Sequence, residues 1–468
     1  MDVAIGLARL EAQIVEDLRR IAWPSTSWVK PRPAPDGGDA LNVLIIGAGQ
    51  GGLTLGFQLA RERVDKVAIL DRSKPQGRGP WKTYGRMLTL RSPKQTTGPD
   101  LDIPSLTFQS WYEAQHGRAA WDDMGKIPKE LWADYLAWYE RVLELPVRSP
   151  ADVLSIRPGA ELVAVDIRTP RGDETLYARH VVLATGIEST GKWWMPDFLA
   201  ALPRDRCSHT ADNVDFGALA GKRVAVLGAG ASAFDNAATA LEAGAAEVHL
   251  FWRREEIQRI QPYKQISYAG FLRHLADLDD DQRWQIMRHL LNLREAFPAE
   301  TWARVTRQPN ARLHSGCDWH GARPTGDGVE LETAEGPFFA HHVIAGTGFD
   351  VDPSACRLLG PISDDIARWS DQHVPPPEDR DPRLARYPYL GSTFELTERQ
   401  PGGCPGLSRV RLFTFGATMS FGPSGSSINA LKFAAPRLIQ GITRDLFREG
   451  ASAHFADLRA YDTPEFEL

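Results

Sequence analysis

Cysteine is scarce in this sequence: four stand among 468 residues, and no two of them form a CxxC pair. Cysteines this far apart supply neither the ligand spacing of a zinc ribbon nor a redox-active dithiol. We therefore predict no metal site and free thiols in a reducing compartment. The residues concerned are Cys207, Cys317, Cys356 and Cys404.

The sequence also lacks a strong excess of charge of either sign. Its formal net charge is -6, and 24% of its residues are charged. This balance disfavours broad binding to nucleic acid or to anionic membranes, so the expected partner is a small molecule. With 43% hydrophobic residues the composition is ordinary for a globular protein, and the chain is long enough to bury two or three cores.

No apolar segment has the form of a membrane span or of a secretion signal. Residues 43–60 are uncharged, but their glycines fit a nucleotide-binding turn better than a lipid-spanning helix. Residues 1–20 predict an amphipathic helix that lacks the apolar centre of a signal peptide. The sequence therefore predicts a cytoplasmic protein.

A glycine-rich stretch near the N-terminus is the most informative motif. Residues 43–46 predict a buried parallel strand, and the glycines after it allow a tight turn and the close approach of a diphosphate. A helix and a second strand follow, and that strand ends in an acid placed for a ribose diol, unless the acid only caps the strand. The predicted ligand contacts are Gly47, Gly49, Gly51, Gly52, Asp71 and Arg72.

A second unit of the same kind begins near residue 223. Its turn has alanine in place of the third glycine, which is a tolerated variant. Its second strand ends in two arginines instead of an acid, and guanidinium groups suit a 2′-phosphate, so NADPH is favoured over NADH. The alternative is that these arginines are solvated side chains. The predicted contacts are Gly228, Gly230, Ser232, Arg253 and Arg254.

Two strands end in the same Thr-Gly pair, one before and one after the second unit, at Thr185-Gly186 and Thr347-Gly348. This repetition predicts an α/β fold in which one Rossmann-like domain is inserted into another. Residues 255–312 have a helical apolar periodicity and are expected to form a helical insertion. The expected boundaries are 1–40 for the N-terminal helix and linker, 41–205 and 335–468 for the outer domain, and 206–334 for the inserted domain.

Two loops have the composition of ligand-binding segments. The first, residues 79–97, mixes aromatic, basic and hydroxyl groups, and loops of this length are often functional. The second, residues 420–429, is rich in Gly and Ser and leads into a helix, where backbone N–H groups can bind an anion; a plain helix N-cap has the same composition. Candidates for ligand contact in the two loops are Trp81, Lys94, Gln95, Gly422, Ser424 and Asn429.

The paired glycine motifs, the Thr-Gly endings and the intervening His209-Thr210 together resemble the class B flavoprotein monooxygenases. The resemblance implies that the first unit holds FAD, that the second holds NADPH, and that the reduced flavin captures O2 to oxygenate a small substrate. It assigns Trp81, Thr185, Gly186, Thr347, Gly348, Gly422 and Ser424 to the cofactors, and Lys94, Gln95, His209 and Asn429 to catalysis.

Two details of the sequence bear on the type of enzyme and the substrate that this resemblance implies. The family's FxGxxxHxxxW/Y fingerprint is represented only by His209-Thr210, which argues against a Baeyer-Villiger enzyme. The N-terminal helix and residues 388–391 resemble a bacterial subgroup that hydroxylates urate. A small polar nitrogen-containing compound, with urate as the first example, is therefore the expected substrate.

Two other hypotheses stay open at the level of sequence. One is a flavin oxidoreductase that passes electrons on without oxygenation, and the other is a nucleotide-binding redox sensor without turnover. A disulfide reductase would carry a close cysteine pair in its first domain, whereas the first cysteine here is Cys207. A yellow protein that consumes NADPH with a defined substrate would distinguish an enzyme from a sensor.

Overall fold

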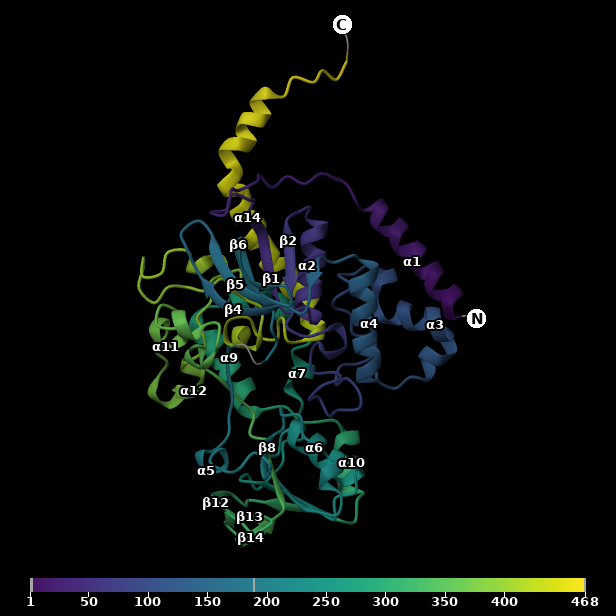
Figure 1. Ribbon diagram of the computed structural model, residues 1–468, viewed down its shortest axis with the longest axis vertical. Helices are drawn as coiled ribbons and strands as arrows, with labels where there is room; N and C mark the ends of the chain where they lie inside the picture. Colours follow the sequence, from purple (N-terminus) through teal and green to yellow (C-terminus); the bar gives the residue numbers. More distant parts are fainter. Residues whose placement is uncertain (1–2, 188–189, 467–468) are drawn as a thin grey trace.

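The computed structural model describes residues 3–187 and 190–466, and its two main sheets lie one above the other along the long axis of the molecule (Figure 1). The upper sheet has the order β3-β2-β1-β6-β5-β4, with β17 also paired to β6. All its pairings are parallel except those that β5 makes with β4 and β6. Its strands are β1 (Leu41–Ile46), β2 (Val67–Leu70), β3 (Val147–Arg148), β4 (Asp152–Arg157), β5 (Val163–Thr169), β6 (Gly172–Leu183) and β17 (Val410–Leu412).

Strand β1 lies at the centre of the upper core because parallel neighbours flank it on both edges. Five of its six residues are buried, as expected for an apolar strand covered on both faces. Helices α2 (Gln50–Arg61) and α14 (Ile428–Ala460) pack against each other within the same core. The aromatic-rich helices α3 (Phe108–Asp123) and α4 (Lys129–Val142) extend this core, and α1 (Val3–Arg20), the predicted amphipathic helix, packs on α3.

The lower sheet is entirely parallel, in the order β11-β10-β9-β15-β8. The chain reaches it after β7 (Gly191–Trp193) and leaves it before β16 (Phe349–Val351), and these two strands pair with each other. The second unit is therefore inserted into the first, as predicted. Its elements are α5 (Asp197–Ala200), β8 (Cys207–His209), β9 (Arg223–Leu227), α6 (Ala231–Glu242), β10 (Glu247–Trp252), β11 (Ala311–Ser315) and β15 (His342–Ala345), with an antiparallel sheet of β12 (Trp319–Thr325), β13 (Gly328–Thr333) and β14 (Gly336–Ala340).

The lower sheet extends past the boundary expected at residue 334. Strand β15 is fully buried and pairs with β9 and β8, so residues 335–345 pack with the second unit instead of the first. Likewise, β11 takes up the end of the segment expected to be helical, residues 255–312. An apolar run does not itself reveal which sheet it joins, because strand pairing is a long-range choice.

The helical insertion connects the two units. Its helix α9 places Trp284 and Met287 in one apolar cluster with Trp369 and Tyr387, which follow β16 in the chain. The insertion thus packs on the returning segment as well as on its own domain. The helices concerned are α7 (Pro262–Gln265), α8 (Ala269–His274), α9 (Asp280–Leu293) and α10 (Ala299–Thr306), with α11 (Trp369–Gln372), α12 (Pro382–Ala385) and α13 (Thr418–Phe421) in the returning segment.

The last helix, α14, begins inside the body of the molecule and its C-terminal part projects away from it (Figure 1). Residues 451–460 are exposed except for the half-buried His454. None of the helices in residues 3–187 and 190–466 has the length and apolar character that a membrane span requires.

Candidate functional site

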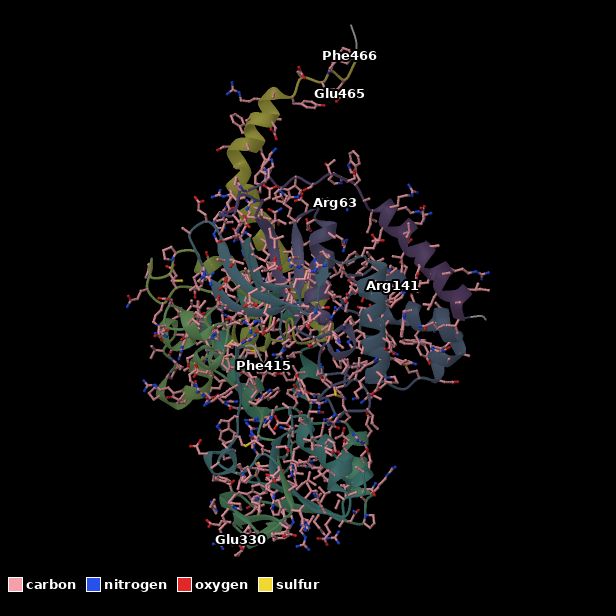
Figure 2. All side chains as sticks on the ribbon, viewed as in Figure 1. Arg63, Arg141, Glu330, Phe415, Glu465 and Phe466 are labelled. Atoms are coloured by element: carbon pink, nitrogen blue, oxygen red, sulfur yellow. The ribbon has the colours of Figure 1, made fainter. Side chains whose placement is uncertain are left out.

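A cleft of about 1880 Å³ lies between the two units. The first unit contributes the β1–α2 turn, the end of β2, and parts of residues 79–97 and 423–433, and the second contributes α6 and residues 295–300. Phe415, labelled in Figure 2, lines the cleft where the two units meet. Pockets for one drug-sized ligand measure about 300–1000 Å³, so the cleft has room for more than one such ligand.

The β1–α2 turn has the shape of a diphosphate cradle at a helix N-terminus. Gly47 has φ 107°, and a Cβ there would lie 2.5 Å from the carbonyl oxygen of Ala184. A Cβ on Gly52 would lie 1.8 Å from the carbonyl oxygen of Gly47, so the chain itself requires both glycines. A Cβ on Gly49, by contrast, would meet no described atom within 4 Å. Gly49 lines the cleft, and its missing side chain leaves room for a ligand.

Polar groups surround this first turn. The Asp71 carboxylate accepts hydrogen bonds from the backbone N–H groups of Ala48 and Ser73, both at 2.8 Å. Asp71 lines the cleft beside Arg72 and Trp81. Because each carboxylate oxygen can accept a further hydrogen bond, Asp71 can hold the turn and still receive a ribose hydroxyl.

The neighbouring strand end and the loop before α14 complete this wall. Thr185 and Gly186 line the cleft, and the Thr185 hydroxyl is buried without a hydrogen-bond partner among the described residues. Gly51 lies against the loop, since a Cβ on it would come within 3.2 Å of the Gly425 carbonyl oxygen. A buried hydroxyl without a partner is costly, which indicates a ligand contact at this position.

The second turn repeats the first. Gly228 has φ 126°, and a Cβ there would lie 2.3 Å from the carbonyl oxygen of Gly346, whereas a Cβ on Gly230 would meet no described atom within 4 Å. Alanine fits at the third motif position, Ala233, because Gly346 faces it: a Cβ on Gly346 would lie only 2.5 Å from the Ala233 Cβ. The variant motif is thus compensated by a glycine at the end of β15.

Three polar side chains of α6 line the cleft: Ser232, Asp235 and Asn236. Buried Asp235 accepts hydrogen bonds from Arg91 of the first unit at 3.4 Å and from Arg304 of α10 at 3.3 Å. Burial raises the pKa of the Asp235 carboxyl, and the two guanidinium groups oppose that rise. Asn236 Oδ1 is buried with no partner in the described chain. The sequence prediction included only Ser232, although polar residues at i, i+3 and i+4 of an alanine-rich helix indicated a polar face.

Arg253 and Arg254 follow β10 directly and are exposed. Arg254 donates a hydrogen bond to the backbone carbonyl of Asn292 at 3.3 Å. Burial lowers the pKa of nearby Arg294, and the charges of Arg383, Arg254 and Arg253 lower it further. These guanidinium groups place several positive charges near the end of β10, where the ribose of a bound dinucleotide lies in Rossmann-like units.

Nine residues predicted to contact cofactors lie outside the lining of the cleft: Gly52, Gly228, Gly230, Arg253, Arg254, Thr347, Gly348, Gly422 and Ser424. The Thr347 hydroxyl donates to the backbone carbonyl of Trp194, and the Gly348 carbonyl accepts from the Trp194 N–H at 2.9 Å, so both hold the chain where it crosses between the units. Gly422 has φ 64°, and Ser424, which belongs to the loop before α14, is fully buried. The sequence did not distinguish residues that support a wall from residues that face a ligand.

The residues predicted to take part in catalysis are not brought together as one group. Lys94 lines the cleft, but its ammonium donates hydrogen bonds to the carbonyls of Trp121 and Asp122 at 2.5 and 3.1 Å. Its charge is therefore held at the C-terminus of α3. Gln95 and Asn429 also line the cleft, from the first loop and from the first turn of α14.

His209 stands at the carboxyl end of β8 with its ring buried. Its Nδ1 accepts a hydrogen bond from the Ala211 N–H at 3.2 Å, and the ring lies 5.2 Å from the Trp193 ring. Burial lowers the pKa of His209, with the nearby Asp212 charge opposing the shift. The neighbouring Thr210 lines the cleft, whereas His209 lies behind that surface.

The four cysteines are free thiols, and three of them are buried. In the part of the chain that the structure describes, no three His, Cys, Asp or Glu side chains are grouped to hold a metal ion.

Comparison with known proteins places this arrangement in a family. The chain is 38% identical over 463 residues to the FAD-dependent urate hydroxylase of Xanthomonas campestris pv. campestris, with 99% of this chain and 98% of that one covered. This chain belongs to the same family, the class B flavoprotein monooxygenases. It is therefore an enzyme, a flavin-dependent oxidoreductase.

Other similarities of this monooxygenase bear on its fold. The family described as pyridine nucleotide-disulphide oxidoreductase matches residues 44–274. An ornithine N-hydroxylase from Kutzneria sp. 744 has a TM-score of 0.65 at 19% identity, covering 87% of this chain and 99% of that one. A bacillithiol disulfide reductase from Bacillus cereus has a TM-score of 0.57 at 15% identity, covering 87% and 99%. Because an oxygenating enzyme and a reductase share the fold, the fold does not determine where the electrons go.

Proposed function

We propose that this enzyme uses NADPH and FAD to insert one oxygen atom from O2 into a small polar nitrogen-containing substrate, and that this substrate is urate. The observation that carries the proposal is the pair of glycines, Gly49 and Gly230, whose missing side chains the described chain does not itself require. Two such turns beside one cleft suit two dinucleotides. A cytoplasmic location, without nucleic-acid or membrane partners, belongs to the same proposal.

FAD is assigned to the first unit. The turn at residues 47–52 would hold its diphosphate at the N-terminus of α2, and Asp71 would accept a ribose hydroxyl. The Thr185 hydroxyl, which has no partner among the described residues, offers a further polar contact. The Xanthomonas relative, similar over nearly the full length, is named as FAD-dependent.

NADPH is assigned to the second unit. The turn at residues 228–233 would hold its diphosphate, and Ser232 lines the cleft beside that turn. Arg253 and Arg254 would bind the 2′-phosphate, because a guanidinium can grip a phosphate through two parallel hydrogen bonds. The positive region around the end of β10 supports this choice over NADH.

Bound FAD supplies the electron transfer and the reaction with oxygen. The chain contributes binding, orientation and the exclusion of water. Contacts between the units help to exclude water, because Arg91 meets Asp235 at 3.4 Å, and Glu300 accepts from Lys126 and from Thr89, both at 2.9 Å. These contacts hold the second unit against the first along one side of the cleft.

Urate follows from the name of the Xanthomonas relative and from the polar lining of the cleft. Oxygenation is tested by following NADPH and O2 consumption by the FAD-loaded enzyme with and without urate, and by measuring hydrogen peroxide with catalase. We expect urate to accelerate NADPH oxidation, with equimolar O2 consumed and little peroxide released. Peroxide equal to all the O2 consumed, whatever purine is added, would contradict oxygenation and favour a reductase.

A further inference from the structure

The cationic side chains that line the cleft differ in whether their charge is already engaged. Arg91 faces Asp235, and the Lys94 ammonium is held by backbone carbonyls. Within residues 3–187 and 190–466, the ammonium of Lys264 makes no hydrogen bond or ion pair. The remaining cations of the cleft have partners: Arg72, Arg86 with the Thr83 carbonyl, Lys126 with Glu300, Arg357 with Asp152, and Lys432 with Asp102.

Lys264 lies on α7, the first helix of the insertion, at a place that hydrogen bonds hold firmly. Gln261 caps α7 by accepting from the Tyr263 N–H at 3.3 Å, and the Ser267 hydroxyl donates to the Tyr263 carbonyl at 2.6 Å. Asn429 Nδ2 of α14 donates to the Ser267 hydroxyl oxygen at 3.0 Å. The exposed Lys264 therefore lies on a segment that is hydrogen-bonded to the start of α14.

The wall that begins at Lys264 continues to the first nucleotide turn. Asn429 accepts a hydrogen bond from the Ser427 hydroxyl at 2.6 Å, and Ser427 belongs to the loop whose Gly425 lies against Gly51. Gln261, Tyr263, Lys264, Ser267 and Asn429 all line the cleft. A ligand between this wall and a flavin on the first turn would thus have the unpaired ammonium within the same cavity.

Tyr263, which precedes Lys264 in α7, adds a neutral hydrogen-bond donor that lines the same cleft. Burial raises the pKa of the Tyr263 phenol, and the charge of Glu295 adds to the rise, so the phenol keeps its proton. No described residue accepts from its hydroxyl. Glu295 is an acidic residue that also lines the cleft. Its carboxylate lies 3.9 Å from the Arg91 guanidinium, which offsets its charge. The part of the cleft wall formed by α7 therefore combines the unpaired ammonium of Lys264 with the hydroxyl of Tyr263, which has no acceptor among the described residues.

We propose that Lys264, with Tyr263 beside it, forms the substrate-binding site for a small planar oxyanion, urate in its anionic form. This assignment rests on the proposed function. An ammonium and a phenol together suit the anionic oxygen of an oxopurine, because charge-assisted hydrogen bonds are the strong ones. A neutral purine without that charge would lose the advantage.

The test compares Lys264→Met and Lys264→Arg with wild type, using the FAD-loaded enzyme. We expect Lys264→Met to weaken urate binding in calorimetry by about 10- to 100-fold, the value of one charge-assisted hydrogen bond. The KM for urate rises correspondingly, while kcat at saturating urate changes little, and Lys264→Arg restores most of the affinity. The matched control is Lys432→Met, which removes another lysine of the cleft whose charge Asp102 already engages, and it leaves urate affinity unchanged.

The outcomes separate this inference from the function on which it rests. Wild-type turnover of urate with equal affinity in Lys264→Met would overturn the site and leave the function standing. Urate binding that depends on Lys264 without urate-dependent NADPH oxidation would contradict the function and retain the site. Absence of urate binding by the wild type would overturn both. Because Lys264 is exposed, FAD content and melting temperature equal to wild type are the expected folding controls.

Discussion

At the scale of single residues, each of the two turns contains one glycine that the backbone itself requires and one that it does not. Gly47 and Gly228 are required by positive φ and by close carbonyl oxygens, whereas Gly49 and Gly230 face open space. Substitutions at the second pair therefore test ligand binding with little cost to packing, since an added Cβ atom there meets no described atom within 4 Å. This distinction is visible only in the structure.

We predict that Gly49→Val yields a folded, colourless protein, because the valine side chain occupies the place assigned to the FAD diphosphate. The matched variant Gly230→Val should keep its FAD and raise the KM for NADPH about tenfold or more, equivalent to about 1.4 kcal/mol. Flavin absorbance per protein and steady-state kinetics measure both effects. Stoichiometric FAD in Gly49→Val would remove the assignment of the first turn.

We predict that the wild type prefers NADPH over NADH and that Arg253→Ala removes most of this preference. The lost phosphate contact should cost about 1.5–3 kcal/mol, or about 10- to 100-fold in kcat/KM with NADPH, with NADH kinetics unchanged. Arg259, exposed in the same segment, supplies the control Arg259→Ala, which should behave as wild type. Equal use of both coenzymes by the wild type would refute the phosphate-binding role.

At the scale of elements, α14 is held to the upper sheet by a buried charge. Arg411 of β17 is fully buried, and its guanidinium donates to Asp445 of α14 at 2.6 Å and contacts His180 Nδ1 at 2.9 Å. Removing one member of such a pair leaves an uncompensated buried charge. The helix therefore depends on this ion pair in addition to its apolar face.

We predict that Asp445→Ala lowers the free energy of unfolding by about 3–5 kcal/mol. The control on the same helix is Asp457→Ala, which removes an exposed ion pair with Lys30 and should cost no more than about 1 kcal/mol. Urea denaturation of the FAD-loaded proteins measures both values. Similar losses in the two variants would show that the buried pair has no special part in holding α14.

The element scale also shows where periodicity was a reliable guide. The apolar pattern of residues 131–139 is typical of a core helix, and α4 buries Trp132, Tyr135 and Tyr139. Residues 411–416 have the composition of a strand, but β17 ends at Leu412 and a 3-10 turn covers Phe415–Ala417. A local pattern identifies an element better than its end, because the end depends on the partner strand.

At the scale of the whole molecule, buried histidines connect stability with pH. Burial is the main cause that lowers the pKa of His180, His209, His249 and His342. Below the usual histidine pKa of about 6.5 the unfolded chain binds protons that the folded chain does not, so stability is complete above that pH and falls as the pH decreases.

We predict a lower melting temperature at about pH 5.5 than at about pH 7.5, with a smaller difference in His180→Gln. The glutamine amide can still accept from Arg411 but cannot take up a proton at these pH values. Differential scanning fluorimetry at the two pH values measures the difference. An unchanged difference in the variant would assign the acid sensitivity to other groups.

Local sequence patterns were enough to predict the two nucleotide turns, the insertion of one unit into the other and the N-terminal helix. Each depends on spacing within a short stretch, since a glycine at a given offset from a strand meets the same local geometry wherever the unit stands. The contacts of single side chains in the loops cannot be predicted in this way. Lys94 and His209 contact Trp121 and Trp193, which lie elsewhere in the sequence.

The folded arrangement of the chain sets which side chains face the cleft and which already have hydrogen-bond or ion-pair partners. It placed β15 in the lower sheet, paired Arg91 with Asp235 across the two units, and left Lys264 of the insertion without a partner in the described chain. It also showed that Gly346 makes room for Ala233. These outcomes depend on contacts between residues distant in the sequence, and whether a charge is free is a property of everything packed around it.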